Sequence, residues 1–361
     1  MRQLQFDDVG PEKVLEVYDP KTKMHGFVVI DNTRLGPGKG GIRMTHDVSV
    51  AEVASLARAM TWKNALAELP FGGAKSGIIA DAKTMDKGQK RAIVDAFARA
   101  LRQVCPSLYV AGPDMYMGEE EMEWFAKANG TPKSCTGKPA SMAGIPHELG
   151  STGHGVFHST LVAAEYLGID IKKATVAIEG FGNVGTFAAK FLTEAGARLV
   201  AVSDSKGCIY NKDGIDYERL METKKKGSVI SYPGKVLKGE EIVGLDADIL
   251  IPAAKPDVIN ETNKAAVRAK IIVEGANIPM TLAIEEELHR RGVLIVPDII
   301  ANAGGVISSY VEHIGGKAEE VFPIVEKKIV KNVKEVLDRS KKEGISPRTA
   351  ALEIARKRVL G

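Results

Sequence analysis

The sequence is poor in the features that organise secreted and membrane proteins. Of its 361 residues only three are cysteines, and their wide, irregular spacing suits neither a disulfide framework nor a zinc site. We expect all three to be reduced, small apolar residues: Cys105, Cys135 and Cys208. No uncharged apolar run approaches the roughly 18 residues that span a bilayer. The first ten residues include two aspartates and lack the apolar core of a secretory signal. We therefore expect a cytoplasmic protein with no membrane partner.

The sequence also lacks a strong excess of charge of one sign. Its 49 basic and 46 acidic residues leave a net charge of +3, which argues against nucleic acid as a partner. Metal binding has little support, because His154 and His158 stand one helical turn apart without a third candidate ligand nearby. The chain does have length. At roughly 150 residues per domain it predicts two domains that share a cleft.

Strand and helix patterns alternate along the chain and predict an α/β fold. Residues 14–19 and 24–31 predict a hairpin, and Ser49 with Glu52 forms a capping-box pattern that opens a helix to about residue 68. Two charged amphipathic helices, broken at Gly344, are expected over residues 321–360. Five short runs, several rich in β-branched residues, predict a buried parallel sheet in the second half: 175–178, 198–203, 249–251, 271–274 and 293–296.

A glycine-rich turn with the pattern G-x-G-x-x-G follows the first of these strands. Gly180 permits the tight turn, Gly182 lets the backbone approach a pyrophosphate, and Gly185 lets the next helix pack close to the strand. Asn183 and Val184 complete the pattern at the start of that helix, whose N-terminus attracts phosphates. The order of strand, glycines and helix predicts a dinucleotide cofactor, NAD or NADP.

Two residues after the next strand give opposing indications of which dinucleotide is bound. Asp204 suits hydrogen bonds from the ribose 2′-hydroxyl of NAD, whereas Lys206 suits the 2′-phosphate of NADP or is simply a lysine in a turn. Both alternatives stay open.

Three lysines of the first half stand in unusual surroundings. Lys39 and Lys75 are embedded in glycine, and Lys63 lies on the face of the first helix that its apolar pattern predicts to be buried. Each stem alone is explained by lying along apolar surface. Together with Asp114, however, the three lysines form a cluster of amine donors with one carboxylate, which suits an anionic substrate.

The motifs that carry these residues resemble one known family. Their order is Gly-Lys-Gly-Gly with Arg43, Trp-Lys-Asn, Gly-Gly-Ala-Lys, Gly-Pro-Asp, Thr-Gly-His-Gly from Thr152, the glycine turn, Glu-Gly-Ala-Asn from Glu274 and Asn-Ala-Gly-Gly-Val from Asn302. This order resembles the glutamate, leucine, phenylalanine and valine dehydrogenases over about residues 26–316. The resemblance implies oxidative deamination of an L-amino acid to a 2-oxo acid and ammonia, with hydride passing to the nicotinamide.

The resemblance also implies the domain plan. Residues 1–150 would form an α/β domain for substrate binding and oligomerisation, with the C-terminal helices, 312–361, packing back on it. Residues 151–311 would form a Rossmann-type domain that binds NAD or NADP. Members of the family are homo-oligomers, and hexamers are usual in the glutamate branch.

The roles of individual residues follow from the same resemblance. Lys75 would be the catalytic lysine, Asp114 would move protons to and from the substrate amine, and Lys63 would bind the α-carboxylate, with Gly73 in the same substrate site. Nearby positive charge and desolvation both depress an ammonium pKa, as a catalytic base requires. On the cofactor side, Thr152 would contact the nicotinamide carboxamide, while Asn277 and Asn302 would line the cleft, which must shut for hydride transfer.

Two positions favour glutamate among the family's substrates. Lys39 and Ser309 resemble the lysine and hydroxyl that glutamate enzymes direct at the distal carboxylate, where leucine and phenylalanine enzymes carry an apolar residue in place of the lysine. The chain length and Met44 resemble the leucine branch instead, so leucine, valine or phenylalanine remains the alternative substrate. A catalytically silent nucleotide-binding regulator is the alternative of another class, which the joint presence of Lys75 and Asp114 disfavours.

Overall fold

The computed structural model describes residues 4–146 and 149–361. The chain divides into two compact units. The first unit comprises residues 1–149, 306–321 and 353–361, and the second comprises residues 150–305 and 322–352. The expected plan assigned all of residues 312–361 to the first domain, whereas this division places 322–352 with the second. Side chains of that segment explain the difference, because Phe322 stacks on His154 with ring centroids 4.4 Å apart, and Tyr166 donates a hydrogen bond to the Leu337 carbonyl.

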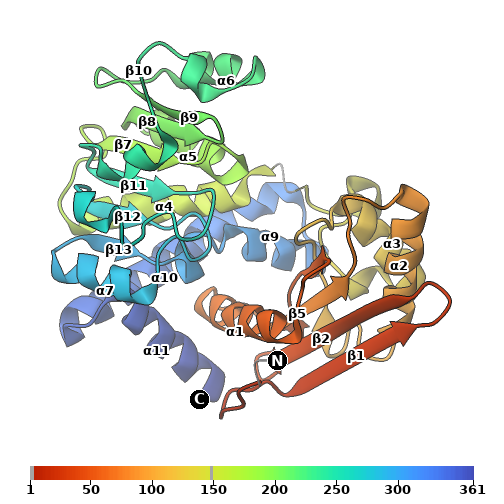
Figure 1. The fold of residues 1–361 in the computed structure, drawn as a ribbon. Coiled ribbons are helices and arrows are strands. Elements are labelled where there is room, and N and C mark those ends of the chain that lie inside the picture. The colour runs from red at the N-terminus through yellow and green to blue at the C-terminus, as the bar shows by residue number, and fades with distance from the viewer. Residues whose placement is uncertain (1–3, 147–148) are drawn as a thin grey trace. The chain divides into compact units, whose positions relative to one another are not determined.

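A six-stranded sheet forms the centre of the first unit (Figure 1). The strand order is β1-β2-β5-β3-β6, with β4 also paired to β5. The predicted hairpin is present as antiparallel β1 (Lys13–Asp19) and β2 (Met24–Asn32). The other strands are β3 (Gly38–Lys39), β4 (Ile42–Thr45), β5 (Gly72–Ile79) and β6 (Tyr109–Val110). Because β3 and β5 are parallel neighbours in register at Lys39 and Gly73, the glycine-embedded lysines come from adjacent strands.

Three helices accompany this sheet. They are α1 (Val50–Leu66), α2 (Lys87–Ala100) and α3 (Glu119–Asn129). Ser49 caps α1 as expected, its hydroxyl accepting from the Glu52 backbone N–H, but the rest of the predicted capping box is not observed. The Glu52 carboxylate pairs with Arg43 instead, because a guanidinium competes better for it than a backbone N–H does. Short 3₁₀ turns follow at Pro132–Ser134 and Ala140–Met142.

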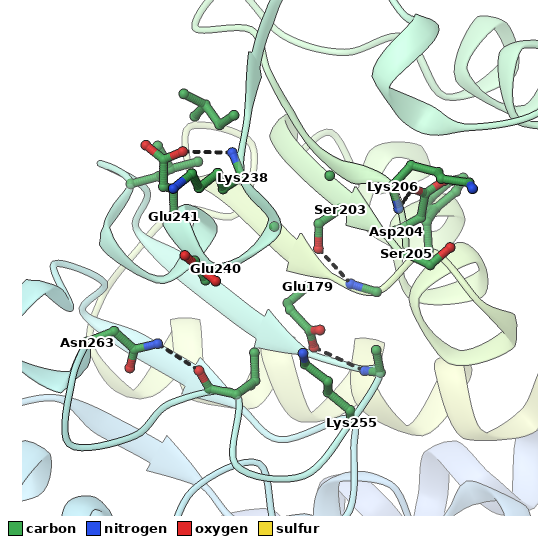
Figure 2. Close-up of a pocket in the computed structure, with 18 of the residues that line it drawn as sticks. Glu179, Ser203, Asp204, Ser205, Lys206, Lys238, Glu240, Glu241, Lys255 and Asn263 are labelled. Carbon is green, nitrogen blue, oxygen red and sulfur yellow. Dashed lines mark hydrogen bonds between the residues drawn. The ribbon is translucent and has the colours of Figure 1, made fainter.

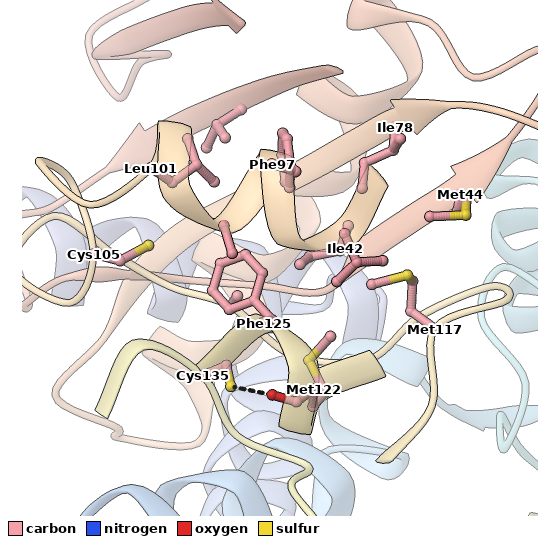
Figure 3. Packing of buried hydrophobic residues seen from close by; sticks show 14 of the residues in the cluster. Ile42, Met44, Ile78, Phe97, Leu101, Cys105, Met117, Met122, Phe125 and Cys135 are labelled. Carbon is pink, nitrogen blue, oxygen red and sulfur yellow. Dashed lines mark hydrogen bonds between the residues drawn. The ribbon is translucent and has the colours of Figure 1, made fainter. Parts of the chain in front are cut away.

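The core of the first unit packs α2 and α3 against the sheet (Figure 3). Phe97 and Phe125 are fully buried, with ring centroids 6.5 Å apart. Cys105 and Cys135 belong to this core, and all three cysteines are free and buried, as predicted. Burial raises the pKa of each thiol to about 12.

The second unit is built on a seven-stranded sheet in the order β10-β9-β8-β7-β11-β12-β13. The five predicted strands form its parallel part: β7 (Thr175–Glu179), β8 (Arg198–Asp204), β11 (Ile249–Pro252), β12 (Ile271–Val273) and β13 (Leu294–Val296). β9 (Gly207–Tyr210) and β10 (Lys235–Leu237) extend it in antiparallel fashion. The first parallel strand, β7, lies between the second and the third, so the chain reverses direction across the sheet at β7. Open α/β sheets bind ligands at such a switch point.

The remaining helices connect or follow these strands. They are α4 (Ser151–Tyr166), α5 (Asn183–Glu194), α6 (Tyr217–Lys225), α7 (Leu282–Arg290), α8 (Asp298–Ala301), α9 (Gly304–His313), α10 (Val321–Glu343) and α11 (Pro347–Leu360), with 3₁₀ turns at Val229–Ser231, Gly239–Gly244, Lys264–Ala266 and Ala318–Glu320. The predicted break near Gly344 separates α10 from α11, and its φ of 66° explains why a glycine stands there. No helix of residues 4–146 and 149–361 is long and apolar enough to cross a membrane.

Candidate active site

Two ionisable residues of the first unit, Lys75 and Asp114, form the centre of the candidate site. Lys75 Nζ lies 3.1 Å from Asp114 Oδ2, although the residues are 39 positions apart in the chain. Lys75 lies in the middle of β5, and Asp114 follows Pro113, which bridges to Ile42 of β4. Arg43 Nε donates to the same Oδ2 at 2.9 Å. Arg43 stands in one of the motifs, but its role is not evident from the sequence.

Burial sets the proton affinity of Lys75. The residue is 8% exposed, and desolvation lowers the pKa of its ammonium group from the ordinary 10.5, although Asp114 opposes that change. Arg43 adds a second positive charge that lowers the pKa further. Lys75 therefore loses its proton more readily than an ordinary lysine, and it lies within hydrogen-bond distance of a carboxylate. Such a lysine is suited to accept and return protons.

Lys39 is more deeply buried than Lys75. It is 4% exposed, its Nζ donates to the Ala111 carbonyl at 2.8 Å, and burial lowers its pKa to about 8. Gly112 makes room for it, because a Cβ at that position would lie 2.7 Å from Lys39 Nζ. Among the described residues, no carboxylate lies within ion-pair distance of Lys39.

The segment of residues 137–145 is tied to α9 through Glu312. This carboxylate accepts hydrogen bonds from the backbone N–H groups of Gly137 and Ile145, and it forms an ion pair with Lys138 that is almost completely buried. Ser309, half-buried, lies about one turn earlier on the same helix. Burial, with the charges of Lys39 and Lys138, lowers the pKa of His313 on this turn. The structure thus brings α9 near Lys39. The hydrogen bonds and the ion pair of Glu312 were not predicted from the sequence.

The other two predicted substrate residues lie where α1 covers β5. Lys63 is partly buried in the last turn of α1. Gly73 is required by packing, since a Cβ there would meet Thr61 Oγ1 at 2.1 Å and the Ala57 carbonyl at 2.4 Å. The close approach of helix and strand therefore explains the glycine without a ligand.

The glycine turn of the second unit has the geometry that a dinucleotide requires. Gly180 adopts a φ of 92°, and a Cβ there would lie 2.3 Å from the Ala254 Cβ. A Cβ at Gly185 would meet the Gly180 carbonyl at 1.9 Å, whereas none of the described atoms lies within 4 Å of one at Gly182. Gly182 also leaves the N-terminus of α5, at Asn183 and Val184, without a side-chain cap. The residues present therefore fit a pyrophosphate group, which would lie over Gly182.

A cavity of about 1410 Å³ opens at this turn. Its lining includes the segments that follow β7, β8 and β11, as expected at a switch point (Figure 2). Asp204 and Lys206, the two residues with opposing indications, both line it. Burial raises the pKa of Asp204, but its hydrogen bonds, chiefly from Lys224, outweigh this effect and lower the pKa to about 2.

The three remaining predicted cofactor residues also belong to the second unit. Asn302 Nδ2 donates to Asn277 Oδ1 at 2.9 Å, so these two predicted residues are brought together. Thr152 lies in the first turn of α4, where a Cβ on Gly305 would be 2.9 Å from its hydroxyl. His154 and His158 are also close, with Nε2 atoms 3.1 Å apart, but the described residues contain no cluster of three or more metal-ligating side chains.

The second unit has a parallel sheet with a glycine turn at its switch point, and the first unit carries a buried lysine–carboxylate pair. These two features define the class of a dinucleotide-dependent dehydrogenase. Comparisons with known proteins give the family. The profile described as Glutamate/Leucine/Phenylalanine/Valine dehydrogenase matches residues 143–361, and that of the Glu/Leu/Phe/Val dehydrogenase dimerisation domain matches residues 11–130. The chain belongs to this family. The predicted family, fold class and enzyme class, an amino acid dehydrogenase, are confirmed.

Individual relatives agree over most of the chain. A glutamate dehydrogenase of Aeropyrum pernix is 41% identical, with 99% of this chain and 93% of that protein covered. An NADP-specific glutamate dehydrogenase of Saccharolobus shibatae is also 41% identical, over 85% of this chain and 77% of that protein. Among solved structures, the hetero-hexameric glutamate dehydrogenase of Thermus thermophilus superposes with a TM-score of 0.86 at 29% identity, covering 97% of this chain and 88% of that chain.

Proposed function

We propose that this protein is a glutamate dehydrogenase, which converts L-glutamate, water and NAD or NADP to 2-oxoglutarate, ammonia, a proton and the reduced cofactor, and which also runs in reverse. The observation that carries the choice of substrate is Lys39, a buried ammonium group with no carboxylate at ion-pair distance within the described chain. Burying an ammonium group without a counter-ion is costly. The distal carboxylate of glutamate would supply the missing charge, and Ser309 would donate to it from α9.

The first unit supplies the acid–base chemistry. Asp114 takes a proton from the substrate ammonium group and so exposes the amine lone pair. Lys75, as the neutral amine, then takes a proton from the water that attacks the iminium carbon. Asp114 returns its proton to the leaving amine, after which the 3.1 Å separation lets Lys75 pass its own proton to Asp114. Arg43 holds the Asp114 carboxylate in place through the shared Oδ2. Lys63 would bind the α-carboxylate, which fixes the substrate Cα.

The second unit supplies the oxidant. A dinucleotide held by its pyrophosphate at the glycine turn would supply the hydride-transfer chemistry. Gly180, Gly182 and Gly185 shape the turn that would hold the pyrophosphate, and the backbone N–H groups of Asn183 and Val184 would donate to it. Thr152 would orient the carboxamide of the cofactor. The hydrogen-bonded pair of Asn277 and Asn302 would line the cofactor site.

The family resemblance further supports a homo-oligomer. We propose a hexamer built through the first unit, whose matched profile is described as a dimerisation domain. The edge strand β1 exposes Val14 and Tyr18, side chains that a second subunit would cover. We also propose a cytoplasmic location. Light scattering after gel filtration gives the subunit number directly.

The substrate assignment is tested by a spectrophotometric screen of the amino acids with both cofactors. We expect glutamate to be the best substrate and Lys39→Leu to lose turnover of glutamate while gaining leucine. Lys127→Leu, which removes an exposed lysine of α3, is the matched control and leaves the profile unchanged. Unchanged glutamate kinetics in Lys39→Leu would refute the assignment. A best activity on leucine, valine or phenylalanine would favour the other branch of the family.

A further inference from the structure

The carboxylate of Asp204 is enclosed by the protein itself. Its side chain is 5% exposed and forms an ion pair with Lys224 at 2.7 Å. It also accepts from the Ser228 hydroxyl at 2.9 Å and from two backbone N–H groups, those of Lys206 and Val229, at 2.9 and 3.0 Å. All of these groups belong to the second unit.

These contacts use the full acceptor capacity of Asp204. A carboxylate has about four lone-pair positions, and four donors already occupy them. A ribose 2′-hydroxyl could bind to Asp204 only by displacing one of these donors, three of which position loops of the protein. Asp204 therefore lacks the property that makes an acid at this position select NAD, namely an acceptor that is free until the ribose arrives.

Lys206 has the opposite character. Ser205 and Lys206 form the two-residue turn between β8 and β9, in which Asp204 pairs with Gly207. The Lys206 backbone is fixed by its hydrogen bond to Asp204, while its side chain is exposed and lines the cavity (Figure 2). Within the described chain the Lys206 ammonium group has no acid at ion-pair distance. Because Lys224 already neutralises Asp204, Lys206 leaves a net positive charge at this turn.

We propose that the cavity selects a dinucleotide with a 2′-phosphate, NADP(H), over NAD(H). Lys206 is the specificity-determining residue that pairs with the phosphate, and Asp204 is the positioning residue that fixes the Lys206 turn. This proposal deepens the dinucleotide part of the proposed function and does not depend on the amino acid that is oxidised.

Equilibrium binding to the purified full-length protein tests the proposal without catalysis. The probes are adenosine 2′,5′-bisphosphate and adenosine 5′-monophosphate, which differ only at the 2′ position, followed by NADPH and NADH, each measured by titration calorimetry. We expect the 2′-phosphorylated member of each pair to bind at least roughly tenfold more tightly. Lys206→Ala should lose most of that ratio and leave the affinity for the monophosphate within about twofold. Lys212→Ala removes an exposed lysine outside the cavity and should keep the ratio.

A substitution that keeps the shape of the side chain tests the role of Asp204. Asp204→Asn retains an oxygen that accepts from the Lys206 N–H and leaves Lys224 without its counter-charge. It should therefore keep the affinity for the monophosphate within about twofold and should not weaken the bisphosphate. A larger loss of the monophosphate and NADH than of the bisphosphate in Asp204→Asn would show that Asp204 binds the ribose, and it would overturn the proposal. If Asp204→Asn does not fold, the wild-type and Lys206→Ala ratios still decide.

The two failures are distinguishable. Equal or tighter binding of the monophosphate and NADH by the wild type would overturn the preference for NADP(H) and leave the glutamate dehydrogenase assignment intact. Absence of binding by every probe would overturn the dinucleotide site itself, and with it both proposals.

Discussion

Replacing Arg348 with methionine should destabilise the second unit by several kcal/mol. Arg348, in the first turn of α11, forms ion pairs with Glu274, Glu285 and Asp298. The two glutamates are at most 1% exposed, and one oxygen of each accepts no hydrogen bond. One guanidinium group therefore compensates three buried carboxyl groups.

The size of the effect follows from this imbalance. Removing one partner of a buried ion pair costs about 3–5 kcal/mol, because the remaining charge stays buried without compensation. At roughly 2–4 °C per kcal/mol for a domain of this size, the melting temperature of the second unit should fall by about 6–20 °C. Methionine keeps most of the volume of the arginine stem. The fall in melting temperature therefore reflects the lost charge more than lost packing.

The loss should also depend on pH. Burial raises the pKa of Glu274 well above the ordinary value of 4.5, and Arg348 opposes that rise. Without Arg348 the pKa of Glu274 rises further. The folded state then holds a proton that the unfolded chain releases above 4.5, so the stability of Arg348→Met falls as the pH rises above that value. The difference in stability between the wild type and the variant is therefore smaller at about pH 5 than at about pH 8.

Calorimetric melting at both pH values measures these differences. Arg356→Met is the matched control, because Arg356 lies on the same helix and pairs with Asp8 at the surface, where an ion pair contributes at most about 1 kcal/mol. Adding Glu274→Gln to Arg348→Met should recover part of the lost stability at the higher pH. A melting temperature within 2 °C of wild type, or a gap that narrows as the pH rises, would refute the electrostatic reasoning.

Three further predictions concern the first unit and the thiols. Lys75→Ala should lower kcat by roughly 10²–10⁴-fold, and in the wild type kcat/KM for glutamate should rise with pH until the Lys75 ammonium group has lost its proton; a flat pH profile would contradict its role as the base. Gly112→Ala should raise the KM for glutamate several-fold with little change in melting temperature, because the added Cβ displaces only the flexible end of Lys39; steady-state kinetics and a melting curve together separate this from unfolding. The three buried cysteines should react with Ellman's reagent only after denaturation, and fast labelling of the native protein would contradict their burial.

Much of the fold could be predicted because its signals are local. The five parallel strands, the hairpin and α10 with α11 are each specified by periodicity or by a glycine within a few residues, and all are present within a few residues of the expected bounds. The short strands β3, β4, β9 and β10 were not anticipated. They span two to four residues, and stretches that short show no measurable alternation of apolar and polar residues. They form because they pair with neighbouring strands.

In the candidate site, too, the sequence predicted the residues that stand in local motifs but not their distant partners. Composition and motifs selected Lys39, Lys75 and Asp114, and the structure brings Lys75 and Asp114 into contact. The sequence could not show that Asp204 is already paired with Lys224, because the ion pair joins residues 20 positions apart on a strand and a later helix. Arg43 and Glu312 were missed for the same reason, since their partners lie 71 and about 170 positions away.

The residues that were missed share a physical property. Each is a charged group with its partner far along the chain, and each fixes the position of a residue that does bear a recognisable motif: Arg43 fixes Asp114, Glu312 fixes the segment next to Lys39, and Lys224 fixes Asp204. A motif specifies which atoms meet a ligand, but burying those atoms requires counter-charges, and any element that the fold brings near can supply them. Counter-charges therefore leave no local pattern. Asp204→Asn is informative for this reason, because it removes the charge that balances Lys224 while leaving Lys206 in place.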